Sequence, residues 1–244
     1  MNEAIRTNPE AMIQGKTYRI SVLTESLLRL EYSEDGVFED HATQAVVNRN
    51  FPVPCFRVDE DHTSLTVTTS RLVLKYNKKP FSQNGLSIRV LGGYSNYRDT
   101  WYYGMDFTDL GGTARTLDKA DGAVPLEHGL MSKNGFSVYD DSHSLLQTED
   151  GWVRPRENKA DDLYFFGYGH DYKQCLKDFY HLCGSVPLLP RYALGNWWSR
   201  YYEYTDSEYR QLMLRFEDEH IPFSVAVLDI NWHLVNVDPK YGSG

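Results

Sequence analysis

The sequence predicts a mainly β protein: an antiparallel β-sandwich or barrel over residues 1 to about 168, then the start of a parallel β/α segment. Two observations predict this. Short runs of alternating apolar and polar residues, separated by turn residues, fill most of the first part. From Gly169 the apolar residues recur with helical period, and an almost continuous apolar run follows at residues 223–230.

Seven short runs in the first part carry the strand pattern. They are residues 18–22, 27–32, 64–68, 72–76, 86–90, 135–139 and 163–166. The first and second runs flank a turn, as do the third and fourth, so each pair predicts a hairpin. The Asp140-Asp141 pair also reads as a hairpin turn. Residues 96–133 have no strong period, and so long an irregular run in a compact domain is usually functional or wrongly assigned.

A helix is predicted to follow the strands. Asp171 can cap its N-terminus, and Gly184 stands where a glycine commonly ends a helix. The apolar residues Cys175, Leu176, Phe179 and Leu182 fall on one side of it. The sequence Val-Pro-Leu-Leu-Pro at residues 186–190 makes a stiff connector. We therefore expect one domain over residues 1–185, ending in this connecting helix, and a second over residues 186–244.

The second domain is predicted to begin a parallel sheet. An apolar run at residues 192–198 precedes a helix that opens with the capping-box pattern Thr205 to Glu208. The apolar run 223–230 follows, and this spacing fits one βαβ unit whose second strand is buried on both faces. Because two parallel strands cannot form a domain, we expect the chain to be a truncated piece of a longer parent.

Composition excludes several classes of partner. The 244-residue chain has a formal net charge of −9 and a pI near 5.3, which disfavours nucleic acids and anionic membranes as partners. No stretch approaches the ~18 apolar residues of a membrane-spanning helix, and residues 1–6 hold no apolar signal region. The three cysteines, an odd number without framework spacing, predict free, buried thiols. These features favour the cytoplasm.

The chemistry is expected where the two strands of the second domain end. Ligands of parallel β/α folds bind at the carboxyl ends of the strands. Here residues 197–202, Trp-Trp-Ser-Arg-Tyr-Tyr, and residues 229–233, Asp-Ile-Asn-Trp-His, bring aromatic rings and a carboxylate to one edge. Rings beside carboxylates suit a pyranose. The alternatives are that Asp229 caps a helix or forms a surface ion pair, and that one of the two tryptophans serves packing alone.

Residues 186–201, VPLLPRYALGNWWSRY, and residues 221–233, IPFSVAVLDINWH, resemble the beginning of the catalytic barrel of glycoside hydrolase family 31. That family comprises retaining α-glucosidases, α-xylosidases and relatives, with a β-sandwich ahead of a (β/α)8 TIM barrel. The resemblance implies that this chain is the sandwich and the first βαβ unit of such a barrel. It also implies a parent that hydrolyses terminal α-linked glucose or xylose in oligosaccharides. The implied partners are the oligosaccharide and the remainder of the barrel; an oligomer is compatible with the family, and no cofactor or metal is expected.

The resemblance also assigns substrate-binding residues. Tyr201 matches a sugar-subsite tyrosine after the first barrel strand, and Asp229 with Ile230 matches the pair that binds hydroxyls of the non-reducing sugar. The family usually continues with a second aspartate, where this chain has Asn231. A sandwich loop of the family also sends an aspartate into the subsite. Asp121 is our candidate for it, with Asp118 as the alternative; a turn-forming role beside Gly122 stays open for either.

The residues that perform the hydrolysis are not expected in this chain. A retaining glycosidase needs a nucleophile and an acid/base carboxyl group about 5–5.5 Å apart. In family 31 both come from later barrel strands, and the nucleophile motif, a Trp-x-Asp-Met-Asn-Glu-like strand end, is missing from the sequence. We therefore expect no catalytic residue and no activity of this chain alone. The competing hypothesis is a non-catalytic carbohydrate-binding β-sandwich with an unfolded tail, which leaves the βαβ pattern unexplained.

Overall fold

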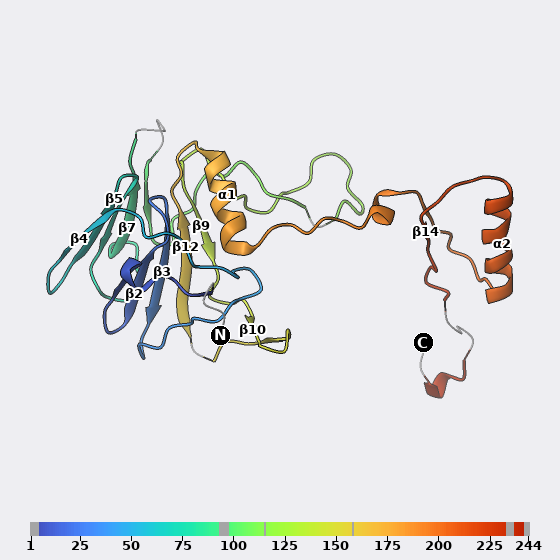
Figure 1. The fold of residues 1–244 in the computed structure, drawn as a ribbon, viewed down its shortest axis with the longest axis horizontal. Coiled ribbons are helices and arrows are strands. Elements are labelled where there is room, and N and C mark those ends of the chain that lie inside the picture. The colour runs from blue at the N-terminus through green and yellow to red at the C-terminus, as the bar shows by residue number, and fades with distance from the viewer. Residues whose placement is uncertain (1–4, 93–97, 115, 158, 233–236, 242–244) are drawn as a thin grey trace. The chain divides into compact units, whose positions relative to one another are not determined.

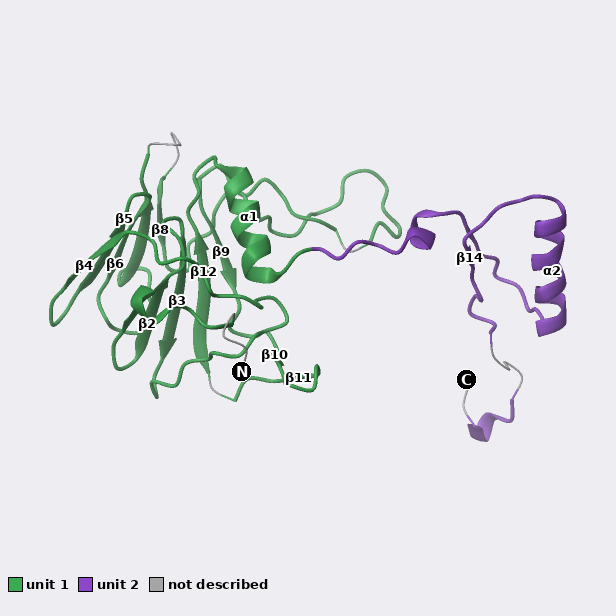
Figure 2. Ribbon diagram, viewed as in Figure 1, with its two compact units in different colours: residues 1–185 green, residues 186–244 purple. Residues whose placement is uncertain are grey.

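The computed structural model describes residues 5–92, 98–114, 116–157, 159–232 and 237–241. His233, the last residue of the quoted motif 221–233, and Arg115, within the irregular run 96–133, lie outside these ranges. The chain divides into two compact units, Met1–Ser185 and Val186–Gly244 (Figure 2). Each unit is described by itself.

The first unit is built on two five-stranded antiparallel sheets (Figure 1). The first sheet has the strand order β1 (Met12–Gln14), β2 (Tyr18–Val22), β3 (Leu27–Ser33), β12 (Ala160–Phe166), β9 (Ser137–Asp140). The second runs β4 (Phe56–Glu60), β5 (Leu65–Thr69), β6 (Leu72–Tyr76), β7 (Leu86–Val90), β8 (Thr100–Tyr102). The prediction of a mainly β protein with antiparallel sheets is confirmed.

One apolar core lies between these two sheets. It combines Ile20, Leu30 and Phe165 of the first sheet with Leu74 and Ile88 of the second, all almost completely buried. Both predicted hairpins are present, with Ile20 opposite Leu30 and Val67 opposite Leu74. Alternation along each strand therefore places one set of side chains in the core between the sheets.

Five strands were not predicted: β1, β4, β8 and a small hairpin of β10 (Leu146–Gln147) with β11 (Val153–Arg154). All but β4 have only two or three residues. Strand β4, Phe-Arg-Val-Asp-Glu, lies at the edge of its sheet, and four of its five side chains are exposed. Because an edge strand needs little apolar surface, its sequence carries a weak strand signal.

Helix α1 (Tyr172–Cys183) covers part of the other face of the first sheet (Figure 1). Its buried Cys175 and Leu182 belong to a second apolar cluster with Leu27, Tyr164 and Phe166 from the sheet. The predicted caps are confirmed. The Asp171 side chain accepts a hydrogen bond from the Gln174 amide, and Gly184 has a φ of +85°.

All three cysteines are free. The expectation that all of them are buried is wrong for Cys55, which is exposed just before the edge strand β4. Cys175 is buried and Cys183 half-buried, both on α1. Burial raises the pKa of each of these two thiols to about 12. None of the helices in the described ranges has the length and apolar character needed to cross a bilayer.

The second unit contains β13 (Trp197–Trp198), α2 (Asp206–Asp218), β14 (Val225–Ala226) and the 3-10 turns η3 (Arg191–Leu194) and η4 (Pro239–Tyr241). The two strands pair in parallel, with Trp197 opposite Val225. The first apolar run is a strand only at its end, because residues 191–194 form η3 instead. The capping box of α2 is present, with the Thr205 hydroxyl accepting the Glu208 amide at 3.2 Å.

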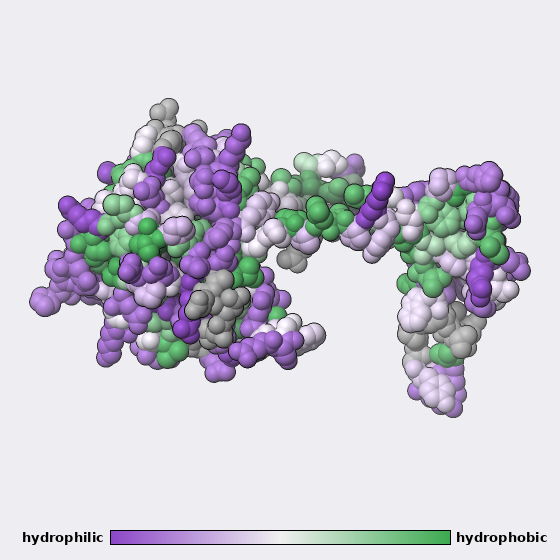
Figure 3. Space-filling view, in the orientation of Figure 1, coloured by the Kyte–Doolittle hydropathy of each residue, from purple (hydrophilic) through white to green (hydrophobic). Residues whose placement is uncertain are grey.

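Helix α2 packs on one side of the strand pair through aromatic contacts. Phe216 lies against Trp198 and Phe223, with ring centroids 5.5 and 5.2 Å apart, and the Tyr209 hydroxyl donates to the Val227 carbonyl at 2.9 Å. Along residues 223–230, half-buried and exposed side chains alternate. The expectation of a strand buried on both faces is therefore wrong for this chain, because only the face toward α2 is covered. Figure 3 shows apolar residues on the surface of this unit. Leu228 and Ile230 are 63% and 62% exposed.

Candidate functional site

The segments that follow β13 and β14 meet at one edge of the second unit. Parallel pairing brings both carboxyl ends to the same side, and the Val227 amide donates to the Trp198 carbonyl at 2.9 Å. A pocket of about 250 Å³ lies there, which we call the rim pocket. Its lining includes Arg200, Tyr202 and Asp206 after β13, and Asp229, Asn231 and Trp232 after β14. This is where ligands of parallel β/α folds bind.

Asp229 is the half-buried carboxylate of this pocket. Its Oδ1 accepts the backbone amide of Ile230 at 2.7 Å, which orients the side chain and leaves its second oxygen for a further donor. Neither a helix cap nor an ion pair engages Asp229 among the described residues, so the structure gives it neither of the alternative roles considered from sequence.

A cation and aromatic rings face this carboxylate across the pocket. The Arg200 guanidinium lies over the Tyr202 ring, 4.5 Å from its centroid, and Tyr202 packs against Tyr204 with centroids 4.6 Å apart. Asn231 donates its side-chain amide to Glu203 at 3.5 Å. A carboxylate, an amide, a guanidinium and ring faces are the groups that bind the hydroxyls and the C–H face of a sugar.

Two of the predicted site residues lie outside the pocket lining. Tyr201 is 70% exposed and Ile230 is 62% exposed. Each is next in sequence to a lining residue, Arg200 and Asp229, and neighbours in an extended chain point to opposite sides. Within this unit the structure brings Asp229 together with Tyr202 rather than Tyr201. The roles of Tyr201 and Ile230 remain predictions.

Arg200 and Tyr202 fall in the segment 197–202 that the sequence predicted at this edge, whereas no binding role was predicted for Tyr204, Asp206 and Arg210, which also line the rim pocket. Asp206 and Arg210 come from the first turn and a half of α2 and stand one helical turn apart. The aromatic run Tyr-Tyr-Glu-Tyr at residues 201–204 was the available signal.

The irregular run of the first unit is a long excursion between β8 and β9. Its two sides are held together by backbone hydrogen bonds, Leu110 N to Met131 O at 2.9 Å and Gly112 N to Glu127 O at 2.7 Å. A Cβ atom on Gly112 would lie 2.7 Å from the carbonyl oxygens of Glu127 and His128, so only glycine allows this close approach. The irregular run is therefore a defined, hydrogen-bonded loop and not a helix or strand that the sequence pattern missed.

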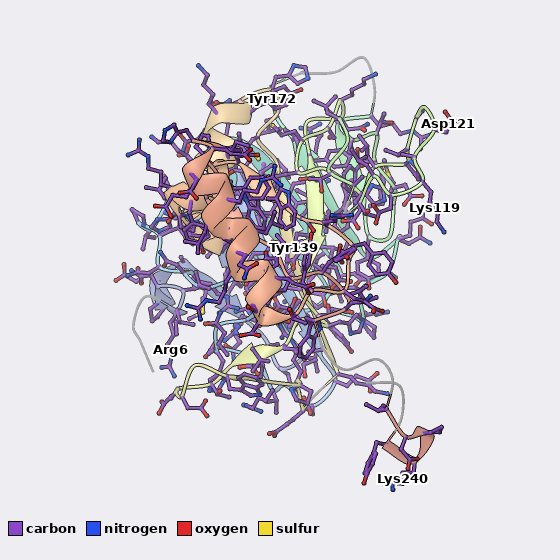
Figure 4. All side chains as sticks on the ribbon, turned by 90° about the vertical axis from the view of Figure 1, so that its right-hand side faces the viewer. Arg6, Lys119, Asp121, Tyr139, Tyr172 and Lys240 are labelled. Carbon is purple, nitrogen blue, oxygen red and sulfur yellow. The ribbon has the colours of Figure 1, made fainter. Side chains whose placement is uncertain are left out.

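A side-chain hydrogen bond joins the base of this excursion, and the candidate aspartates lie at its tip. The Asp109 carboxylate and His128 Nδ1 are 2.5 Å apart, and His128 holds the pKa of Asp109 below its usual range. Figure 4 shows Asp121 and Lys119 at the tip. Asp118 and Asp121 are both exposed, and the sequence-derived choice between them stays open.

No group of three or more histidine, cysteine, aspartate or glutamate side chains within the described ranges could hold a metal ion.

Comparison with known proteins identifies relatives of both units. Residues 186–242 match the family model for the glycosyl hydrolases family 31 TIM-barrel domain. An α-xylosidase of Saccharolobus solfataricus is 27% identical over 135 residues, which are 52% of this chain and 17% of that protein. Alpha-glucosidase 2 of Bacillus thermoamyloliquefaciens is 32% identical over 105 residues, 43% of this chain and 13% of that protein.

Solved structures show the same fold. A family 31 dextranase of Flavobacterium johnsoniae, complexed with glucose, has a TM-score of 0.54 at 16% identity, covering 90% of this chain and 32% of that one. A family 31 α-xylosidase from a soil metagenome, complexed with xylose, has a TM-score of 0.56 at 12% identity, covering 94% and 43%. The chain thus spans less than half of each relative. Together these comparisons support an N-terminal portion of a glycoside hydrolase family 31 protein, with the family model matched over residues 186–242.

Proposed function

We propose that this chain supplies the β-sandwich, residues 1–185, and the first βαβ unit of the catalytic barrel, residues 186–244, of a retaining α-glycosidase. The parent enzyme releases terminal α-linked glucose or xylose from oligosaccharides. The observation that carries the proposal is the rim pocket, where a half-buried carboxylate faces tyrosine rings at the carboxyl ends of two parallel strands.

Asp229 acts by binding substrate hydroxyls. Its Oδ1 is already held by the Ile230 amide, so the second oxygen accepts a sugar hydroxyl without reorganisation. A hydrogen bond to a charged acceptor is stronger than one between neutral groups, and its strength grows where the sugar excludes water. We also propose the sugar-binding roles that the family resemblance implies for three further residues. They are Tyr201 and Ile230 in the second unit and Asp121 on the excursion of the first unit.

The uncovered face of the strand pair supports a place in a larger sheet. Leu228 and Ile230 are mostly exposed, while Val225 and Val227 on the opposite face are half-buried. Strands of a parallel barrel are buried on both faces, with helices outside and packed side chains inside. We infer that the remainder of the barrel covers this face and is the partner of the second unit.

The names of the relatives support the substrate class. They are an α-xylosidase, an α-glucosidase and a dextranase, the last also solved with isomaltotriose as a variant. The chain itself is proposed to be inactive. The family's nucleophile motif does not occur in its sequence, and binding groups alone supply neither the nucleophile nor the proton that a retaining mechanism needs.

The test compares the 244-residue chain with a longer product of the same gene, assayed on p-nitrophenyl α-glucoside and α-xyloside. We expect turnover only by the longer product. In it, Asp229→Asn should lower kcat/KM by ~30- to 150-fold, equal to the loss of a charged hydrogen bond in the transition state. The matched control is Asp238→Asn, an exposed aspartate paired with Lys240 in η4, which should keep wild-type efficiency. Turnover by the short chain, or full efficiency of Asp229→Asn, would contradict the proposal.

A further inference from the structure

A second and larger cleft lies in the first unit. It has a volume of about 850 Å³ and opens beside the first sheet, where β3 ends, β12 begins and β9 ends. These strand ends are neighbours, since Asp161 pairs with Tyr32 and Leu163 pairs with Asp140 (Figure 1). We call this the sandwich cleft. Its lining residues all belong to the first unit and share none with the rim pocket.

Aromatic rings form one wall of the sandwich cleft. Tyr32 and Phe81 both line it, with ring centroids 5.7 Å apart. Behind Phe81 stands Tyr103, 5.6 Å from it. The Tyr32 ring is half-buried and Phe81 is 8% exposed, so the wall is fixed by packing before any ligand arrives. Such a wall is a preorganised surface for the apolar face of a ring-shaped ligand.

Hydrogen-bonding groups lie beside this wall, because Asp161 is the cross-strand neighbour of Tyr32. The half-buried Asp161 accepts a hydrogen bond from the Tyr103 hydroxyl, and burial together with the nearby Asp140 raises the pKa of Asp161. Lys159 and His143 add donors at the exposed side of the cleft. Acceptors and donors thus alternate within one cavity.

A buried arginine belongs to the lining of the cleft. The Arg156 side chain is only 5% exposed, and its Nη2 donates to Asp162 at 3.0 Å and to Asp141 at 3.3 Å. Its Nη1 is buried without a hydrogen-bond partner among the described residues. Because this nitrogen has almost no accessible surface, it does not face the open cleft, and the Arg156 charge is already balanced by Asp141 and Asp162.

The lining selects among ligand classes. Three carboxylates, Glu34, Asp140 and Asp161, face two fixed cations, Arg156 and Lys159, which disfavours an anionic ligand. The described residues form no metal-binding group. So many charged groups disfavour an apolar ligand, whose binding would leave them desolvated and unpaired. A neutral molecule with many hydroxyls matches both the donors and the acceptors and packs its C–H face on Tyr32.

We propose that the sandwich cleft is a non-catalytic binding site for a neutral oligosaccharide. The sugar packs on Tyr32, and its hydroxyls bond to the Asp161 and Lys159 side chains. This site is separate from the hydrolytic function proposed above, because all of its lining residues belong to the first unit. A site of this kind tethers a polymeric substrate to the protein and raises its local concentration.

The test is a titration of the 244-residue chain with maltotriose and with isomaltotriose, followed by amide chemical shifts. We expect saturable shifts at residues lining the sandwich cleft. Asp161→Asn, which retains an oxygen for the Tyr103 hydroxyl, should weaken binding at least about tenfold. Lys159→Gln changes an exposed side chain and should weaken it several-fold. Asp229→Asn is the matched control, because it removes a carboxylate from the rim pocket only and should leave this affinity unchanged.

Several results would overturn the proposal. They are the absence of saturable binding, unchanged affinity in both Asp161→Asn and Lys159→Gln, or loss of binding in Asp229→Asn alone. Displacement of the sugar by inorganic phosphate would also overturn it, because it would assign the cleft to an anion. Far-UV circular dichroism and thermal unfolding check that each variant is folded. Hydrolysis by the longer product is a separate measurement, so failure of this site and failure of the proposed function are distinguishable.

Discussion

Arg29 donates from Nε and Nη2 to the two carboxylate oxygens of Asp162, each at 2.8 Å, and both side chains are almost completely buried. The pair joins β3 to β12 on the face of the first sheet that points away from the inter-sheet core. It is the centre of a buried network in which Arg19 pairs with Glu31 at 2.6 Å and Arg156 with Asp162 at 3.0 Å.

Removing one partner of this pair should destabilise the first unit strongly. Arg29→Ala leaves the Asp162 carboxylate buried without its bidentate donor, and we expect a loss of about 3–5 kcal/mol in the free energy of unfolding. The control is Arg57→Ala, whose pair with Asp59 is exposed and should contribute less than about 1 kcal/mol. Urea unfolding followed by circular dichroism measures both. Similar losses for the two variants would contradict the role given to burial.

The same network makes stability depend on pH in the acid range. Although burial opposes it, the charges and hydrogen bonds of Arg29 hold the pKa of Asp162 well below its usual range. A carboxyl group with a depressed folded-state pKa contributes stability above its unfolded pKa of about 4 and loses it as the pH falls toward the folded value. Burial raises the pKa of Glu31 and of Asp141, which gives these two groups the opposite pH dependence.

We therefore expect Asp162→Asn to be less stable than the native chain at neutral pH and to lose less of its remaining stability below about pH 4. Urea midpoints measured across this pH range test the prediction. A variant curve that ran parallel to the native curve would show that Asp162 does not carry this linkage.

Thiol reactivity should separate the three cysteines. The thiolate is the reactive form, and burial raises the pKa of Cys175 and Cys183 to about 12, whereas Cys55 is exposed. We expect one fast-reacting thiol with Ellman's reagent at pH 8 in the folded chain and three in denaturant. In Cys55→Ser the fast phase should vanish; its persistence would mean that α1 opens readily.

Amide exchange should be faster in the second unit than in the first. Val225 lies in the two-residue strand β14 and Val227 follows it directly, and both are half-buried, whereas Ile20 and Leu30 are fully buried inside a five-stranded sheet. Exchange follows local opening, which is easiest where few apolar contacts hold the backbone. Mass spectrometry of a proven monomer measures the difference. Equal protection in the two units would contradict it.

Local signals in the sequence predicted the elements that local interactions stabilise. Helix α1 begins and ends where Asp171 and Gly184 indicate, helix α2 begins where Thr205 indicates, and two hairpins form across their short turns. Caps and tight turns involve residues a few positions apart, so the sequence contains the complete interaction.

The buried network could not be predicted in this way. Along β2 and β3, charged residues such as Arg19 and Arg29 alternate with apolar ones, which normally indicates a strand with one face in solvent. The partner of Arg29 lies 133 positions away, and nothing local in the sequence pairs them. The Asp140-Asp141 pair likewise reads as a turn, yet Asp141 is fully buried and accepts from Thr43 and Arg156.

The candidate site was likewise predictable only in part. The position of Asp229 at the end of a parallel strand follows from the apolar run before it, and the structure places it in the rim pocket. Which tyrosine joins it depends on the path of the chain after β13. An irregular segment has no period from which the direction of Tyr201 or Tyr202 could be read.

The pairing of β3 with β12 has a consequence during synthesis of the chain. The N-terminal hairpin of β2 and β3 leaves the ribosome long before β12. Until β12 is synthesised, the backbone groups of β3 that will pair with it have no strand partner. Arg29 and Glu31 stand on this edge of β3, and charged side chains discourage the pairing of one nascent chain with another. Before β12 pairs with β3, the charged residues of the later network therefore oppose aggregation of the nascent chain. They become buried only when β12 has been synthesised and has paired.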